Sequence, residues 1–258
     1  MISDGKWGDL GARVLSAIVM LVVGLMALWL GGILFHALVA IVCGGMIWEL
    51  TRMLAPSKPA APLQMGLLAG FALFSIAFIP PLFFLPVLLA PAIVGATSLR
   101  KDRLIYVAYA AGLLLAAFGL IMLREFRGLE WVVWLVLVVI ATDVAGYFAG
   151  KAFGGPKFWP KISPKKTWSG TSAGWLAAAV VGFFFAGPGL ALVSVAISLA
   201  SQLGDIAESA IKRRAGVKDS SQLIPGHGGL LDRFDGLMAA ALLILVISSL
   251  VGLPSHPG

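Results

Sequence analysis

Long, uncharged apolar segments constrain the fold of this chain more than any other feature of its sequence. Residues 14–30, for example, read VLSAIVMLVVGLMALWL and contain no charged side chain. A helix needs roughly 17–25 apolar residues to cross a bilayer, whereas the strands of a membrane barrel alternate over about ten. Apolar residues make up 60% of the 258 residues and charged residues only 12%, which does not fit a soluble surface. We therefore expect an all-α polytopic membrane protein.

About nine transmembrane helices are predicted. Gly187-Pro188-Gly189 separates the seventh from the eighth, and this breaker sequence favours a tight hairpin over one overlong helix. The spans divide the chain into residues 1–130, with the first five helices, and residues 131–258, with the last four and two polar loops, 150–171 and 205–236. The predicted spans are Val14–Leu30, Ile33–Trp48, Leu63–Ile79, Leu82–Ser98, Leu104–Leu123, Trp131–Ala149, Ser172–Ala186, Leu190–Leu203 and Leu237–Gly252.

The distribution of positive charge predicts the orientation of the chain in the membrane. Of the 19 Lys and Arg residues, all but Arg124 and Arg127 fall on one side of the predicted spans, and such residues stay on the cytoplasmic side. The N-terminus and both polar loops are therefore expected in the cytoplasm, and the C-terminus outside it. This asymmetry accounts for the net charge of +7 without a nucleic acid partner. The single cysteine, Cys43, excludes an intrachain disulfide and a cysteine-based zinc site.

Four carboxylates are expected at the cytoplasmic ends of three predicted helices. Asp143 lies near the end of the sixth span, Asp205 follows the eighth, and Asp232 and Asp235 precede the ninth. A buried acid costs roughly 2.5–3.5 kcal/mol near mid-bilayer, so each needs a partner. One interpretation is that the acids pair with lysines and hold the helices together. The other is a magnesium site, because Mg²⁺ favours one or two carboxylates together with substrate phosphate oxygens.

A basic loop follows the sixth predicted span. Lys165 and Lys166 stand between the hydroxyls of Ser163 and Thr167, next to a proline that stiffens the chain. Two ammonium groups with two hydroxyls suit a phosphate clamp. The same loop could instead be a positive segment that meets lipid headgroups.

Two further polar segments lie before the ninth predicted span. Residues 205–213 are expected to form a helix, because Asp205, Glu208 and Lys212 recur at three- and four-residue spacing on one polar face. Residues 225–229 form a glycine-rich turn whose backbone N–H groups could approach an anion closely.

Four motifs follow one another between residues 209 and 235. They are Ser209-x-x-Lys212-Arg213, Lys218-Asp219, Pro225-Gly226-His227-Gly228-Gly229 and Asp232-Arg233-x-Asp235. Their order and spacing resemble the signature of the phosphatidate cytidylyltransferases, also called CDP-diacylglycerol synthases. The resemblance extends to Gly204-Asp205 with Glu208, to Ser163-Pro164-Lys165-Lys166-Thr167, and to Asp143 with Gly150-Lys151, and so covers residues 140–240. In one departure, this chain has Ser169 where the family usually has Glu.

The resemblance implies an enzyme of phospholipid biosynthesis that transfers CMP from CTP to phosphatidate, giving CDP-diacylglycerol and pyrophosphate, with Mg²⁺. It implies that Asp205 and Asp232 bind the metal, together with Asp143. His227 is expected to shape the glycine turn, because a phosphate monoester has its second pKa near 6 and needs no general base. The other catalytic residues implied are Lys212, Arg213, Lys218, Asp219, Arg233 and Asp235. The substrate-binding residues implied are Lys151, Ser163, Lys165, Lys166, Thr167, Ser209, Gly226, His227, Gly228 and Gly229.

Two other functions would use similar residues. A related CTP-dependent polyprenol or phytol kinase would release CDP, and a cation transporter would bind ions at Asp143 and Asp205. The acids gather on one face and no inverted repeat is visible, which disfavours the transporter. The resemblance also implies a homodimer. The bacterial inner membrane is the expected location, and the charge distribution predicts an active site that faces the cytoplasm.

Overall fold

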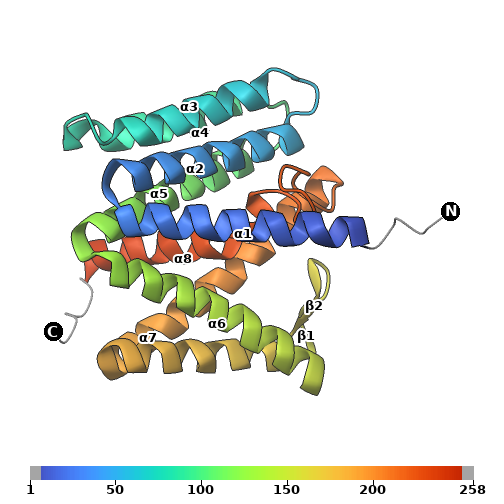
Figure 1. Ribbon diagram of the computed structural model, residues 1–258. Coiled ribbons are helices and arrows are strands. Elements are labelled where there is room, and N and C mark those ends of the chain that lie inside the picture. Colours follow the sequence, from blue (N-terminus) through green and yellow to red (C-terminus); the bar gives the residue numbers. More distant parts are fainter. Residues whose placement is uncertain (1–6, 252–258) are drawn as a thin grey trace. The chain divides into compact units, whose positions relative to one another are not determined.

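The computed structural model describes residues 7–251, whose helices fall into two compact units (Figure 1). The first unit contains the chain up to Ile121 and the later segment Ala215–Phe234. The second contains Met122–Arg214 and the chain from Asp235 onward. Lys6, one of the basic residues predicted to lie on the cytoplasmic side, and Gly252, the predicted end of the last span, lie outside the described residues.

The first unit is a group of apolar helices joined by short connections. Gly31 and Gly32 have φ angles of 64° and 51°, which glycine adopts without strain. They let the chain reverse direction between its first two helices (Figure 1). The elements are α1 (Trp7–Leu30), α2 (Gly32–Leu54), α3 (Ala61–Ser75), a 3₁₀ turn (Pro81–Phe83), α4 (Phe84–Ala96) and most of α5 (Arg103–Arg127).

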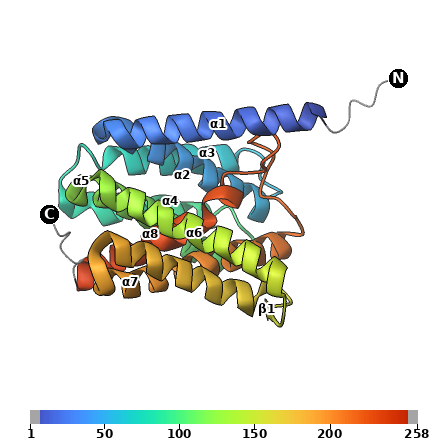
Figure 2. The same ribbon diagram turned by 60° about the horizontal axis from the view of Figure 1, so that its bottom comes forward.

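Helices α2 and α3 pack closely because glycines face each other across their contact. The two helices lie side by side in both views (Figures 1 and 2). A Cβ atom on Gly66 would stand 2.8 Å from the carbonyl oxygen of Gly44, and one on Gly70 would stand 3.2 Å from that of Ala40. Small residues at helix contacts let transmembrane backbones approach in this way. The contact holds α2, whose last turns carry polar side chains, against α3.

The second unit combines long helices with a small hairpin. Its elements are α6 (Leu129–Phe153), β1 (Lys157–Trp159), β2 (Ser163–Thr167), α7 (Trp168–Ala215) up to Arg214, and most of α8 (Leu231–Leu250).

Helix α7 consists of two arms that fold back on each other. Its 48 residues would extend about 72 Å as one straight helix, far more than a bilayer requires. Ala186 and Gly187 have non-helical backbone angles and break the helix. Trp175 Nε1, on the first arm, donates to Gln202 Oε1 on the second at 3.1 Å. The predicted hairpin between the seventh and eighth segments is therefore confirmed.

Helix α6 packs against both arms of α7, and α6 lies beside α7 in Figure 2. A Cβ atom on Gly170, in the first arm, would stand 2.5 Å from the carbonyl oxygen of Gly146. Thr142 Oγ1 donates to Ser198 Oγ in the second arm at 2.8 Å. These contacts hold the halves of α6 and α7 that carry Asp143 and Asp205 in one packed group.

Within residues 7–251, seven helices are long and apolar enough to cross a membrane. The helical membrane class predicted from the sequence is thus confirmed. The predicted fourth span corresponds to a shorter apolar helix, Pro81–Ala96, and the predicted seventh and eighth correspond to the two arms of α7. Nine crossings, and the orientation of the termini, stay predictions.

The prediction of an all-α chain is wrong for one short segment. Residues 157–159 and 163–167, taken as loop, form an antiparallel hairpin in which Lys157 pairs with Thr167 and Trp159 with Ser163. Strands of three and five residues are too short for an alternating apolar pattern. A ring contact between Phe158 and Trp168, with centroids 4.7 Å apart, holds the hairpin to the start of α7.

We expect Gly66→Ala to destabilise the first unit. The added Cβ would meet the Gly44 carbonyl oxygen at 2.8 Å, and this oxygen cannot move without shifting α2. Overpacking of this kind costs about 1–3 kcal/mol, which thermal unfolding of the detergent-solubilised protein measures. Gly24→Ala is the matched control, because nothing lies within 4 Å of its added Cβ. Equal unfolding temperatures for the two variants would contradict the close α2–α3 contact.

Candidate functional site

A cavity of about 350 Å³ in the second unit gathers five of the predicted site residues. Its walls come from α6, β2 and both arms of α7. One carboxylate and three ammonium groups border it, so the cavity can hold an anionic ligand and a cation together. The predicted residues that line it are Asp143, Lys151, Lys165, Lys166 and Thr167.

Lys166 links this cavity to a cluster of acids. Its Nζ lies 2.5 Å from Asp205 Oδ2 and donates to the carbonyl oxygen of Gln202 at 3.1 Å. Each side chain of the ion pair is 25% exposed, so solvent screens the pair less than a surface pair. The negative charge of Asp205 also acts on Asp143 and Asp235. Lys166 therefore offsets repulsion among three carboxylates that come from α6, α7 and α8.

Hydrogen bonds tie the basic hairpin to the helices on both sides of it. Thr167 Oγ1 accepts from the backbone N–H of Gly170 at 3.2 Å and so caps the first turn of α7. Ser169 Oγ donates to the carbonyl oxygen of Gly154, at the end of α6, at 2.5 Å. Ser163 begins β2. The hydroxyl of Ser169, at the position where a Glu was expected from the resemblance, thus closes the connection between α6 and the hairpin.

The second arm of α7 carries the polar face predicted for residues 205–213, and the predicted helix is confirmed. Glu208 Oε2 and Lys212 Nζ lie 2.5 Å apart, one turn along the helix, and the Glu208 side chain is 2% exposed. Ser209 is half-buried and Arg213 is exposed at the helix end. Lys212 therefore neutralises a buried acid in its own helix.

In the first unit, Asp232 organises the signature loop, defined as Ala215–Phe234. Asp232 Oδ2 accepts from the backbone N–H of Ser220 at 3.0 Å, from Ser220 Oγ at 2.8 Å and from the backbone N–H of Gly229 at 2.8 Å. The carboxylate stands at the first turn of α8, where the helix dipole favours negative charge. One oxygen of Asp232 thus holds the loop at two separated points.

The glycine turn at the tip of the loop has a backbone conformation that only glycine adopts readily. Gly226 and Gly228 have φ angles of 73° and 86°. His227 donates its backbone N–H to the carbonyl oxygen of Ile224 at 2.9 Å. Its own carbonyl oxygen accepts from Arg233 Nε at 2.8 Å and Nη2 at 2.6 Å. The predicted residues of this turn therefore hold one another in place.

Helix α1 also contacts the turn. Ser16 Oγ lies 2.9 Å from His227 Nδ1 and donates to the carbonyl oxygen of Pro225 at 3.0 Å. The His227 ring is thus held by a hydroxyl from the other end of the chain.

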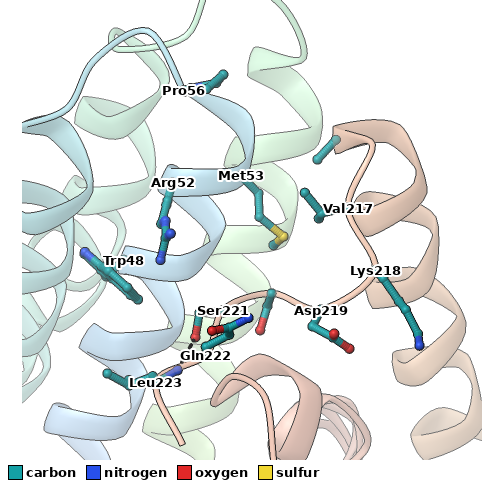
Figure 3. A pocket seen from close by; sticks show the side chains of 12 residues that line it. Trp48, Arg52, Met53, Pro56, Val217, Lys218, Asp219, Ser221, Gln222 and Leu223 are labelled. Atoms are coloured by element: carbon teal, nitrogen blue, oxygen red, sulfur yellow. Dashed lines mark hydrogen bonds between the residues drawn. The ribbon is translucent and has the colours of Figure 1, made fainter.

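A second cavity, of about 750 Å³, lies between the last turns of α2 and the signature loop (Figure 3). Trp48 and Arg52 project into it from α2. Lys218 and Asp219, both predicted site residues, border it from the loop and are exposed. The motif Lys218-Asp219 therefore belongs to a different cavity from the basic hairpin.

Glu49, in α2, is a site residue that no sequence motif reveals. Its side chain is 0% exposed, and its carboxylate accepts hydrogen bonds from three donors of the signature loop. They are Ser221 Oγ at 2.6 Å, Leu230 N–H at 2.9 Å and Leu231 N–H at 2.7 Å. Ser220 Oγ, which donates to Asp232, lies 3.2 Å from Glu49 Oε2. Glu49 therefore anchors both ends of the glycine-rich part of the loop.

The predicted residues thus form two groups, one in each unit. The first turns of helix α8 carry Asp232, which belongs to the first unit, and Asp235, which belongs to the second. The first group consists of Lys218, Asp219, Gly226, His227, Gly228, Gly229, Asp232 and Arg233, and the second of Asp143, Lys151, Ser163, Lys165, Lys166, Thr167, Asp205, Ser209, Lys212, Arg213 and Asp235.

The donor chemistry of the acid cluster fits Mg²⁺. Asp205 carries an oxygen beside Lys166, and its charge acts on Asp143 and Asp235, so a divalent cation would relieve their repulsion. Among the side chains described here, no group of three or more His, Cys, Asp or Glu is placed to hold a metal ion without further ligands. Mg²⁺ commonly binds one or two carboxylates and takes its other ligands from substrate phosphate and water.

Carboxylates and lysines that meet around a cavity, as in the second unit, can bind phosphate groups together with a metal ion. The sequence matches the cytidylyltransferase family over residues 11–251. The chain belongs to this family, and it is a nucleotidyltransferase.

Named relatives of the chain are bacterial. The chain is 37% identical to the phosphatidate cytidylyltransferase of Brucella suis biovar 1 over 272 residues, which cover 96% of this chain and 97% of the relative. It is 36% identical to that of Brucella abortus biovar 1 over 269 residues, 95% and 96% of the two chains. For the Mycobacterium tuberculosis protein, identity is 39% over 145 residues, 54% and 44% of the two chains.

We expect Glu49→Gln to loosen the signature loop. Glutamine has one acceptor oxygen, so at least one buried donor loses its partner, at a cost of about 1–3 kcal/mol. Limited proteolysis should then cut within residues 215–234 faster than in the parent protein. Glu125→Gln, an exposed acid at the end of α5, is the matched control and should leave the digestion unchanged. Identical digestion of Glu49→Gln and the parent would show that Glu49 does not anchor the loop.

Proposed function

We propose that this protein transfers CMP from CTP to phosphatidate and releases pyrophosphate, so that CDP-diacylglycerol is the product. The observation that carries the proposal is the meeting of Asp143, Lys165, Lys166 and the Asp205 ion pair at one cavity. Carboxylates and lysines together suit a metal-bound triphosphate better than either alone. The near full-length similarity to phosphatidate cytidylyltransferases supports the same reaction.

Asp143 and Asp205, both in the second unit, are proposed to bind Mg²⁺, with Asp235 in the same unit, and Asp232, which the resemblance also implied as a ligand, lies in the first unit. When bound, the ion would stabilise negative charge on the transferring phosphoryl group and on pyrophosphate. Asp232 uses one oxygen to hold the signature loop, so its contribution includes shaping the site.

The basic residues are proposed to bring two anions together. An oxygen of the phosphatidate phosphate forms a bond to the α-phosphorus of CTP, and the bond from that phosphorus to the β-phosphate bridging oxygen breaks. Lys151, Lys165 and Lys166 border one cavity, where they would offset the repulsion between the lipid phosphate and the triphosphate. Alignment of the two reacting groups would supply much of the remaining rate enhancement.

No general base is needed for this step. The second pKa of a phosphate monoester is near 6, so the attacking oxygen is mostly ionised at pH 7. His227 is hydrogen-bonded through its backbone to Ile224 and Arg233 and through its ring to Ser16. These contacts support a role in shaping the glycine turn around CTP.

Membranes that contain the protein are expected to release pyrophosphate from CTP only when phosphatidate is added. Asp205→Asn should lower this rate by a factor of about a hundred or more, because a lost charge of this kind is worth several kcal/mol and each 1.36 kcal/mol is tenfold. Glu125→Gln, remote in sequence from both acid motifs, should keep the parent rate.

Each competing function gives a different product in this assay. CDP in place of pyrophosphate would identify a lipid kinase, and cation flux without CTP turnover would identify a transporter. If Asp205→Asn turned over CTP at a rate within threefold of the parent rate, Asp205 would not be a metal ligand.

We also propose nine membrane crossings in the bacterial inner membrane, with the N-terminus and the active site on the cytoplasmic side, and a homodimer. The short helix Pro81–Ala96 and the two arms of α7 would supply the crossings beyond those of the longer helices. The charge asymmetry of the loops supports the orientation.

A reporter that is active only outside the cytoplasm tests this topology. Fused after Leu253 it should be active, and fused within residues 154–161 it should be inactive, because the loop there is rich in lysine. Activity at the second position would overturn the orientation and the cytoplasmic CTP site.

A further inference from the structure

Helix α1 presents a polar face to the glycine turn, although α1 lies outside the segment that carries the family resemblance. Ser16 and Arg13 are three residues apart and therefore share one side of the helix. Ser16 is half-buried, whereas its neighbour Leu15 is 64% exposed and Val19 is 50% exposed. A Cβ atom on Gly226 would collide with Cγ of Arg13. The signature loop thus lies directly beside α1 (Figures 1 and 2).

The hydrogen bonds of Ser16 indicate which atom carries the proton between Ser16 and His227. Ser16 Oγ lies 3.0 Å from the carbonyl oxygen of Pro225, 3.0 Å from that of Arg13 and 2.9 Å from His227 Nδ1. A hydroxyl has one proton, and a carbonyl oxygen can only accept. Two of the three neighbours therefore require the hydroxyl proton, which leaves the ring to donate from Nδ1–H to Ser16 Oγ.

A proton on Nδ1 fixes the state of the His227 ring. The bond that one imidazole nitrogen makes decides which tautomer is present, so the neutral ring keeps Nε2 as an acceptor. The same hydroxyl holds the carbonyl of Pro225, while the backbone of His227 is held by Ile224 and Arg233. The turn is thus fixed from α1 as well as from within the signature loop.

We propose that Ser16 is a positioning residue of the nucleotide site, an inference that rests on the proposed function. Its hydroxyl holds the His227 ring in the Nδ1–H tautomer and keeps the Pro225 carbonyl in place, so the glycine turn has its binding shape before CTP arrives. A preorganised site loses less conformational freedom when its ligand binds. Loss of the hydroxyl therefore weakens CTP binding more than it slows the chemical step.

Steady-state kinetics of the full-length protein in mixed micelles tests this role. Ser16→Ala should raise the KM for CTP about fivefold, the effect of one hydrogen bond, and leave kcat and the KM for phosphatidate within twofold. Ser16→Thr, which keeps a hydroxyl, should restore the parent KM. Ser75→Ala is the matched control, because Ser75 Oγ donates to the Ala72 carbonyl oxygen within its own helix, α3, at 2.8 Å. An unchanged KM for CTP in Ser16→Ala would overturn the proposal.

A double-mutant cycle tests whether Ser16 acts through the His227 ring. In His227→Ala the ring is gone, and the exposed carbonyl of Pro225 can bond to water. Ser16→Ala should therefore change the KM for CTP less than twofold in that background. A further fivefold increase would mean that the effect of Ser16 does not pass through the ring, which contradicts the proposal.

Solid-state NMR of the protein in lipid vesicles measures the tautomer without turnover. Isotope-labelled histidine reports which ring nitrogen carries the proton, and His227→Ala identifies the His227 signal by its loss. At about pH 8.5, where an imidazole is neutral, we expect Nδ1–H in the parent and in Ser16→Thr, and a shift toward Nε2–H in Ser16→Ala. The same tautomer in the parent and in Ser16→Ala would show that Ser16 does not set it.

The two kinds of failure are distinguishable. A parent protein that releases no pyrophosphate from CTP and phosphatidate defeats the proposed function, whichever tautomer His227 adopts. A parent that turns over, with Nε2–H at His227 and the same KM for CTP as Ser16→Ala, overturns the role of Ser16 alone.

Discussion

Buried polar groups in this protein must find partners within the protein, because lipid offers none, and its functional parts are arranged around that constraint. Glu49 is 0% exposed among apolar helices, and donors of the signature loop surround it. The loop must therefore return to α2 to satisfy the carboxylate. Within the second unit, Lys166 and Asp205 satisfy each other in the same way. In each unit, the partner of the acid lies in a segment that the sequence also predicts to bind phosphate: the signature loop for Glu49, and the basic hairpin for Asp205.

Glycine residues let neighbouring helices approach each other closely. Gly44 faces Gly66 in the first unit, and Gly146 faces Gly170 in the second. The backbones come near enough to place α2 against α3 and α6 against α7, because the facing backbone occupies the space that a side chain would take.

The reaction proposed for this chain joins two anions, and the distribution of charge suits that task. At the cavity of the second unit, lysines lie next to carboxylates. Lys212 neutralises the buried Glu208, and Lys166 neutralises Asp205. Arg52 and Lys218 form no ion pair within residues 7–251. Paired cations preserve the architecture, and unpaired ones remain available to a ligand.

The sequence by itself determined the membrane class, the break in α7, the helix over residues 205–213 and the motifs that carry the family resemblance, because each rests on local spacing or composition. It did not reveal the hairpin of residues 157–167, whose strands are too short to show a period. Nor did it reveal Glu49, which directly follows a predicted span and whose partners lie more than 170 positions away in the chain. Only the tertiary structure assigned Lys218 and Lys166 to different cavities and joined Asp205 to Lys166. Spacing along a chain predicts which residues share a helix face, whereas contacts between elements depend on packing that no local pattern encodes.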